Sequence, residues 1–407
     1  MRSSEPSVVG ARRALLLAVT LAAAVASLSL SGFRFKDDDS ILYGHIAAGL
    51  VDQPVSSWIE PHWPPARPRG YQAAMPGNWK TGPFEEHMAV FFWLPALVGK
   101  MGAGPELAIL AANLVYILLI LLLIYALVRE RYGEPAAHLA TWTWVFSQAG
   151  LTYLVRGNHE PALAVGVLGA ILGMVRLPRH VGWGALMVAS VVWCFAMKGV
   201  VGLVIFPTLV AWWWCTGRSR RGVVAVGVAL VVTAVFALLY DAAYQARTGH
   251  SFFRAYLSIH TGYAAEKEQF HPLKKLVNVG FYAGNALLGF APWSLALVWL
   301  VVRAAREKRK DLLDDVTRAT LLTLAIYIAF LATFDRRSIR YIFSVYPVMA
   351  VCCAPLVLQL SARLRGWVEK LWRHSPEMLM GASMLVLWVR IYVHMNHYSY
   401  ISTHALN

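Results

Sequence analysis

The sequence predicts an all-α protein that crosses a membrane many times, and two observations lead to this prediction. Hydrophobic residues make up 58% of the 407 residues and charged residues only 14%, and the mean hydropathy is +0.52. Apolar runs of about 20 residues recur along the whole chain, and each is long enough to cross a hydrocarbon core of about 30 Å. The spans must be helices, because lipid offers the backbone no hydrogen-bond partners.

The apolar runs divide the chain into about eleven expected transmembrane helices. We treat residues 1–407 as a single transmembrane domain and expect no soluble domain at the carboxyl end. The first run is read as a retained span, because its small-x-small segment, Ala24–Ala26, lies inside the run. Only Lys198 and Gly199 separate the fifth span from the sixth, which predicts a tight hairpin. The expected spans are about 14–32, 105–128, 135–153, 160–177, 181–197, 199–215, 222–244, 278–302, 317–334, 341–361 and 377–394.

Basic residues mark one side of the membrane. They precede the first span and follow the second, fourth, sixth, eighth and tenth spans, so all fall on one side if the spans alternate. The positive-inside rule makes that side cytoplasmic, with the amino terminus inside and the carboxyl terminus outside. The formal net charge of +15 therefore reflects topology and does not indicate a nucleic-acid partner. The cysteines lie inside apolar runs without metal-type spacing, so we expect buried thiols at Cys194, Cys215, Cys352 and Cys353.

Two long loops are expected on the outer side, at residues 33–104 and 245–277. The first contains "GHIAAGLV" and "FEEHMAVFFWLPALVGKMGAG", which are amphipathic and too short to span, so we expect helices that lie in the membrane interface. The same loop is rich in aromatic residues, which suit sugar stacking and interfacial anchoring equally well. These aromatic residues are Trp58, Trp63, Tyr71 and Trp79.

Ionisable side chains gather at the outer ends of the spans, where the cost of burial makes them functional candidates. Carboxylates near a separate basic cluster suit a reaction with an anionic substrate. Simpler explanations remain: a solvated end of the first span for the aspartates, a helix N-terminus for Glu85 and Glu86, lipid head groups for the arginines, and snorkelling for Lys198. The gathered residues are Asp37, Asp38, Asp39, Glu85, Glu86, His87, Arg156, Asn158, His159, Glu160, Lys198, His260, Glu266, Glu268, His271, Asp335, Arg336, Arg337 and Arg340.

Short motifs follow one another in order along nearly the whole chain. They are "DSILYGHIA", "FEEHMAVFFW", "RGNHEPAL", "MKGVVGLVIFP", "GHSFFRAYLSIH", "FAPWSLAL" and "RYIFSVYPVMA". In order and spacing they resemble the GT-C superfamily glycosyltransferases, most closely the branch of bacterial aminoarabinose transferases and dolichyl-phosphate-mannose-protein mannosyltransferases. The chain departs from that pattern at Ser40, where the family has a second acid, and at Met88 and Val200, where it has proline.

The resemblance implies a GT-C-like bundle and a membrane glycosyltransferase of the cell envelope. Such an enzyme moves a sugar, with inversion, from a polyprenyl-phosphate donor to a protein, glycan or lipid acceptor. The reaction is expected on the extracytoplasmic face of the bacterial inner (plasma) membrane. Two alternatives stay open: a non-enzymatic lipid or polysaccharide transporter, and a catalytically degenerate GT-C-like protein. A transporter is expected to have repeated halves or broken helices, and we expect neither here.

The candidate site residues follow from the motifs and from the chemistry. A carboxylate at the membrane face can take a proton from the acceptor, and the first candidate for this base is Asp39, followed by Asp38 and Glu86. Fixed cations can stabilise the departing phosphate, and the candidates are Arg336, Arg337, Arg340 and Lys198. Supporting roles are expected for Tyr43, His87, Glu160, His260 and Tyr341.

A divalent metal is a further hypothesis, and the sequence requires no cofactor. The family resemblance gives His260 a part in a metal site, and Glu86 can join it as a second ligand. Two ligands make an incomplete site, because metal sites in proteins take three or four protein ligands.

Overall fold

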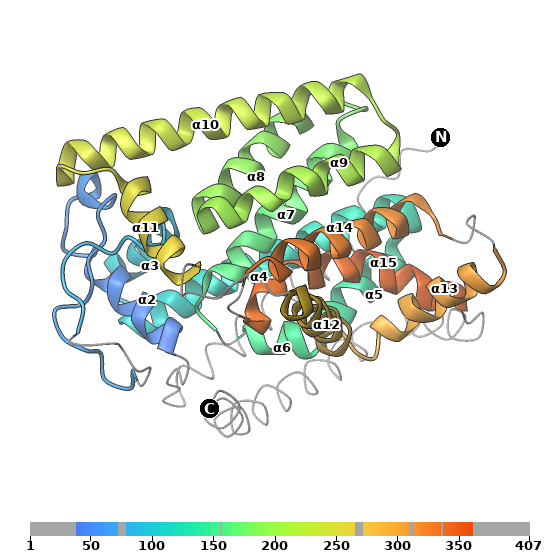
Figure 1. The fold of residues 1–407 in the computed structure, drawn as a ribbon, viewed down its shortest axis with the longest axis horizontal. Helices are drawn as coiled ribbons and strands as arrows, with labels where there is room; N and C mark the ends of the chain where they lie inside the picture. The colour runs from blue at the N-terminus through green and yellow to red at the C-terminus, as the bar shows by residue number, and fades with distance from the viewer. Residues whose placement is uncertain are drawn as a thin grey trace.

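The computed structural model describes residues 38–71, 79–145, 147–154, 156–264, 272–308, 313–334 and 337–360. In these ranges every regular element is a helix, and β geometry is limited to one isolated bridge between His62 and Pro83. The all-α prediction is confirmed (Figure 1). The spans expected at the two ends of the chain lie outside the described residues, as does Arg336.

Five helical stretches among the described residues are long and apolar enough to cross a membrane. The number is six if one bent pair counts as a single span, so about eleven spans stays a prediction. The five are α4 (Pro105–Tyr132), α7 (His159–Arg176), the stretch Gly182–Thr216, α10 (Arg220–Thr248) and α14 (Asp315–Ala332). The third stretch contains α8 (Gly182–Lys198), η2 (Gly199–Val204) and α9 (Ile205–Thr216).

The chain reverses at η2, as the predicted hairpin requires. Gly173, near the end of α7, lies against Trp183 at the start of α8. Gly222, which follows α9, lies against Met174 of α7 and Trp213 of α9. The start of α8 and the end of α9 therefore meet the same end of α7.

Three expected spans are interrupted in the structure. The span expected at 278–302 is a pair, α12 (Pro272–Gly289) and α13 (Ser294–Arg306), bent by 118°. Pro292 lies in the break. Proline has no backbone N–H to donate, and it disfavours the helical conformation of the residue before it. We expected no broken helix, so this expectation was wrong. The other interrupted spans are α5 (Glu134–Val145) with α6 (Gln148–Leu154), and η4 (Ile339–Ile342) with α15 (Val345–Leu360).

The two expected helices of the first outer loop are α2 (Asp38–Ala48) and α3 (Val90–Lys100), with the short η1 (Val55–Ser57) between them. α2 begins before the predicted stretch, because Asp38 and Asp39 occupy its first turn, where acids favour the helix dipole. Figure 1 shows α2, α3 and α11 (Phe252–Ala264) together at one end of the molecule.

The tryptophans of this loop hold the loop itself together. Trp58 and Trp63 are buried, and the Trp58 indole donates to the Leu50 carbonyl at 2.8 Å. The Trp79 indole donates to the Pro64 carbonyl at 2.7 Å. Neither sugar stacking nor interfacial anchoring therefore describes Trp58 and Trp63, because their rings are covered by the loop.

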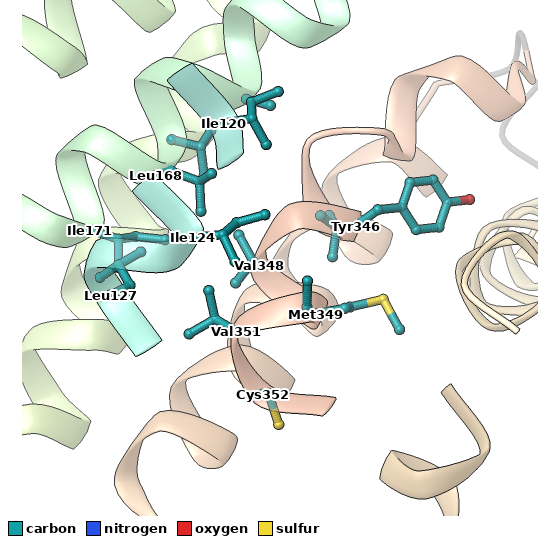
Figure 2. Close-up of a cluster of buried hydrophobic side chains, with 14 of the residues drawn as sticks. Ile120, Ile124, Leu127, Leu168, Ile171, Tyr346, Val348, Met349, Val351 and Cys352 are labelled. Carbon is teal, nitrogen blue, oxygen red and sulfur yellow. The ribbon is translucent and has the colours of Figure 1, made fainter. Parts of the chain in front are cut away.

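The core lies where α4, α7 and α15 meet. Figure 2 shows Ile124 and Leu127 of α4 and Ile171 of α7 close to Val348 and Val351 of α15. All of these side chains are buried, which fixes α15, and the η4 segment before it, against the earlier part of the chain.

Two of the basic clusters predicted to share one side, those after the second and fourth expected spans, lie at one end of the bundle, opposite α2 and α3. Arg176 and Arg179 pair with Glu130 of α4 at 2.8 Å and 2.6 Å. Arg131 lies 3.6 Å from Asp315 at the start of α14. We call this the basic end, and the end that holds α2 the site end.

Candidate functional site

An ion pair between Asp39 and Arg340 joins the start of the described chain to its last part at the site end. Asp39 lies in the first turn of α2, and Arg340 lies in η4 just before α15. The two side chains are 31% and 27% exposed, so both can reach solvent or a ligand. The structure thus brings together the expected base and one of the expected phosphate-binding cations.

A second ion pair, between Lys198 and Glu160, lies deeper. The Lys198 ammonium donates to Oε1 of Glu160 at 2.5 Å, and the side chains are only 9% and 3% exposed. The Tyr341 ring connects the two pairs, since Lys198 Nζ lies 5.1 Å and Arg340 Cζ 5.5 Å from its centroid. At these distances a ring attracts both cations.

The local sequence explains the position of Lys198. It is the last residue of α8, where a cation favours the helix dipole. Gly199 follows with a φ of 54°, and a Cβ there would lie 2.5 Å from the Tyr256 hydroxyl. That hydroxyl donates to the Lys198 carbonyl at 3.4 Å. Burial raises the pKa of Tyr256 to about 12, so the hydroxyl keeps its proton as a donor.

Several buried polar atoms beside these pairs have no hydrogen-bond partner in the described part of the chain. Glu160 keeps Oε2 unpaired although Oε1 is bonded, and Arg340 keeps Nε unpaired. The two residues before Glu160 add Asn158 Oδ1 and His159 Nε2. Such atoms are costly unless something binds them, so they can serve a polar ligand.

His87 lies in a buried aromatic cluster next to Lys198. Its Nε2 shares a hydrogen bond of 3.1 Å with the Tyr43 hydroxyl, and its ring lies 3.9 Å from the His159 ring, which stacks on Phe91. Burial, and then the nearby charges of Lys198 and His260, hold the pKa of His87 well below its usual value. His87 is therefore neutral and supports α2 and α7 by packing.

Glu86 and His260 have other partners than each other. Glu86 Oε1 accepts from Lys80 at 2.8 Å. His260 donates from Nδ1 to the Tyr256 carbonyl at 2.9 Å, and burial lowers its pKa although nearby Glu86 raises it. The described residues contain no group of three or more side chains that could hold a metal ion. A metal site at Glu86 and His260 therefore stays a prediction, and we derive no step through one.

The remaining candidates lie at the edge of this region. Arg337 donates from Nε to Asn278 Oδ1 at 2.6 Å, and the Asn278 amide donates to the Phe334 carbonyl at 2.9 Å. Arg337 therefore holds the turn before η4 against α12. Asp38 is half-buried in the first turn of α2, beside Asp39.

Two residues of this region had no predicted role. His159 stood among the ionisable residues at outer span ends, but no motif position marked it. Tyr256 lies inside the motif that ends at His260, yet its contact with Gly199 depends on the packing of α11 on the end of α8. The sequence held one signal for this contact: the glycine directly after the lysine in "MKGVVG" lets another side chain pack close to the backbone there.

Comparison with known proteins gives one family model and several solved structures. Residues 86–242 match the model for dolichyl-phosphate-mannose-protein mannosyltransferases. The fold is similar to ArnT from Cupriavidus metallidurans bound to undecaprenyl phosphate, with a TM-score of 0.65 and 17% identity, over 87% of this chain and 61% of that chain. It is also similar to the apo oligosaccharyltransferase from Archaeoglobus fulgidus, with a TM-score of 0.56 and 13% identity, over 95% of this chain and 56% of that chain. Curated protein sequences give no match.

The chain has the GT-C fold, which confirms the resemblance found in the sequence. Within that class, the mannosyltransferase family model covers the segment from Glu86 in the first outer loop to Ala242 in α10. The matched region covers only about three fifths of the ArnT chain, so the activity of ArnT is that of a longer protein than the sequence described here.

Proposed function

We propose that the protein is a glycosyltransferase that moves a sugar from a polyprenyl-phosphate donor to an acceptor at the site end of the bundle, with inversion. This end faces the outside of a bacterial inner membrane, and the amino terminus is cytoplasmic. The observation that carries the proposal is the contact between Asp39 and Arg340 beside the buried Lys198–Glu160 pair. The similarity to a fold that binds undecaprenyl phosphate in ArnT supports the donor class.

In this mechanism Asp39 acts on the acceptor. Its Oδ2 is held by Arg340, which leaves Oδ1 to accept the proton of the attacking hydroxyl or amine. The attacking atom bonds to the anomeric carbon on the face opposite the phosphate. The bond from that carbon to the phosphate oxygen breaks, and the electron pair stays on the phosphate.

Arg340 and Lys198 act on the departing phosphate. Negative charge grows on the phosphate as the bond breaks, and cations fixed in advance stabilise it without reorganisation. Arg340 Nε has no hydrogen-bond partner among the described residues, so the guanidinium can bind phosphate while it still contacts Asp39. The Tyr341 ring and Glu160 keep the two cations in place.

The experiment supplies radiolabelled hexoses and pentoses on undecaprenyl phosphate to the purified protein in nanodiscs, together with membrane extract as acceptor. We expect Asp39→Asn to lower the transfer rate by about 10²- to 10⁴-fold, the range of a general base. Asp38→Asn tests the neighbouring candidate, and Asp52→Asn is the control, because Asp52 is an exposed aspartate of the same loop. Wild-type rates in both Asp38→Asn and Asp39→Asn would overturn the assignment of the base.

The bent pair α12–α13 favours the transporter as a second candidate, because transporters use broken helices. The same label separates the two functions. A glycosyltransferase moves the sugar to a new molecule and releases undecaprenyl phosphate. A transporter leaves the sugar on its carrier, and in proteoliposomes it changes only the side of the membrane on which the label is found.

A further inference from the structure

One buried hydrogen bond ties the helix that carries Asp39 to the turn that precedes Glu160. The Ser40 side chain is fully buried in α2, and its hydroxyl accepts a hydrogen bond of 2.8 Å from the Gly157 backbone amide. The two residues are 117 positions apart in the chain. Ser40 directly follows Asp39, and Gly157 stands three residues before Glu160, so the bond links the two segments that carry the carboxylates of the two ion pairs.

Both bonded segments are also pressed against α4. A Cβ atom at Gly157 would lie 2.5 Å from Cγ1 of Ile109, so only glycine lets the turn lie this close to α4. On α2, a Cβ atom at Gly44 would lie 2.8 Å from the Pro105 carbonyl oxygen at the start of the same helix. With α4 as their common support, α2 and the turn have little room to move, and Ser40 supplies a polar link between them.

We infer that Ser40 is a positioning residue that sets the separation between the Asp39–Arg340 pair and the Glu160–Lys198 pair; this inference rests on the proposed function. The resemblance to GT-C enzymes leads one to expect an acid at this position. An acid there would be fully buried, and burial disfavours a charge far more than a hydroxyl. It would also place a second negative charge beside Asp39, which raises the pKa of both. Serine satisfies the buried amide without either cost, so this departure from the family pattern is compatible with activity.

The test compares Ser40→Ala and Ser40→Thr in nanodiscs with the undecaprenyl-phosphate sugar that the wild-type protein turns over fastest. Ser40→Ala is expected to lower kcat by about 10- to 100-fold, the effect of a small displacement of a reacting group. The KM for the donor is expected to rise less than kcat falls, because both phosphate-binding cations remain in the site and a displaced base slows only the chemical step. The acidic limb of the kcat–pH profile is expected to shift, and Ser40→Thr, which keeps the hydroxyl, is expected to restore kcat.

Ser147→Ala is the matched control. The buried Ser147 hydroxyl also accepts from a glycine amide, that of Gly150 at 3.0 Å, but this bond stays within one turn of the chain. Its loss is expected to leave kcat within about twofold of wild type. The thermal midpoint is measured for every variant, so that a loss of folded protein is recognised.

The outcomes distinguish the inference from the proposed function. A Ser40→Ala kcat within about twofold of wild type would overturn the inference alone. Equal losses in Ser40→Ala and Ser147→Ala, or a loss that Ser40→Thr does not restore, would give Ser40 a purely structural role and overturn it as well. If the wild-type protein turns over no donor, the proposed function falls and the inference falls with it.

Discussion

The Lys198–Glu160 pair shows how a charge is kept in the interior of this protein. Both side chains are almost fully buried, and each would be unstable there without the other. Burying a pair costs desolvation, which the close contact offsets. The pair therefore adds little net stability, although each charge depends on the other.

Removal of one partner of this pair is expected to be much more harmful than removal of both. Lys198→Met should lower the free energy of unfolding by about 3–5 kcal/mol, because Glu160 keeps a buried charge without a counterion. The double variant Lys198→Met with Glu160→Gln should recover most of that loss. Urea unfolding in detergent micelles, followed by tryptophan fluorescence, measures each step.

The Lys80–Glu86 pair is the matched control for this measurement. It has a similar contact of 2.8 Å, but its side chains are 42% and 23% exposed. Lys80→Met should change the free energy of unfolding by no more than about 1 kcal/mol, since solvent screens an exposed pair. A loss in Lys198→Met as small as in Lys80→Met would contradict the burial of the Lys198–Glu160 pair.

Among the elements, α7 and α8 pack through a row of glycines. Gly166, Gly169 and Gly173 lie three and four residues apart, so they share one face of α7. A Cβ at Gly169 would lie 2.5 Å from Ser190 Oγ, and a Cβ at Gly173 would lie 2.8 Å from the Met187 nitrogen and the Trp183 carbonyl oxygen. This contact holds Glu160 and Lys198, at the other end of the two helices, in register.

We expect Gly173→Ala to destabilise the protein, because the added methyl group meets backbone atoms that cannot rotate away. Overpacking of this kind costs about 1–3 kcal/mol. Gly227→Ala in α10 is the control, since a Cβ there meets nothing within 4 Å. Alanine is the better helix former by about 1 kcal/mol, so Gly227→Ala should leave the thermal midpoint unchanged or raise it. Equal midpoints for the two variants would contradict the close packing of α7 on α8.

A second element-level contact holds the first outer loop on the end of α10. Glu85 accepts hydrogen bonds from the Tyr244 hydroxyl at 2.9 Å and from His250 at 2.6 Å. Arg247 contacts Glu60 at 3.2 Å and Ser57 at 2.7 Å. The hydrogen bond to Glu85 raises the pKa of His250 above its ordinary value, so the folded protein favours the protonated ring.

The His250 contact is expected to weaken as the pH rises. Since the pKa is higher in the folded state, the stabilisation is fully present below the unfolded pKa of about 6.5 and is lost as the pH passes through the raised value. The difference in thermal midpoint between wild type and His250→Ala should therefore shrink as the pH rises above about 6.5. A difference that is constant with pH would contradict the ionic contact.

The whole molecule has two chemically different ends, and this difference predicts its orientation. The basic end collects arginines that the positive-inside rule places in the cytoplasm. The site end carries the mixed acids, histidines and cations around Asp39. If the site uses a lipid-linked donor outside the cytoplasm, the two ends must face opposite sides of the membrane.

Cysteine labelling of a cysteine-free variant in spheroplasts tests this orientation. Val55→Cys lies in η1 at the site end, where the native side chain is 63% exposed, and it should react with a membrane-impermeant maleimide. His180→Cys, next to Arg179 at the basic end, should react only after the membrane is permeabilised. The reverse pattern would place the site in the cytoplasm and remove the reason for a lipid-linked donor.

Hydropathy was sufficient to predict the helices of this protein, but not their breaks. α4, α7 and α10 follow the expected spans closely, because each is one long apolar run. The bend between α12 and α13 was missed, because hydropathy averaged over a segment does not register the effect of one residue, Pro292, on a few backbone hydrogen bonds. The order of the motifs likewise indicated the GT-C fold, because the motifs lie at the ends of successive helices and their order therefore follows the order of those helices.

Only the packed structure decided which residues at those helix ends meet. It paired Asp39 with Arg340, bonded Glu86 to Lys80 and Arg337 to Asn278, and buried Trp58 and Trp63. The physical reason is that the insertion of a segment into lipid depends on its average polarity, and this can be calculated from the sequence alone. A contact between distant side chains depends on ångström-scale positions that the packing of all the helices sets together.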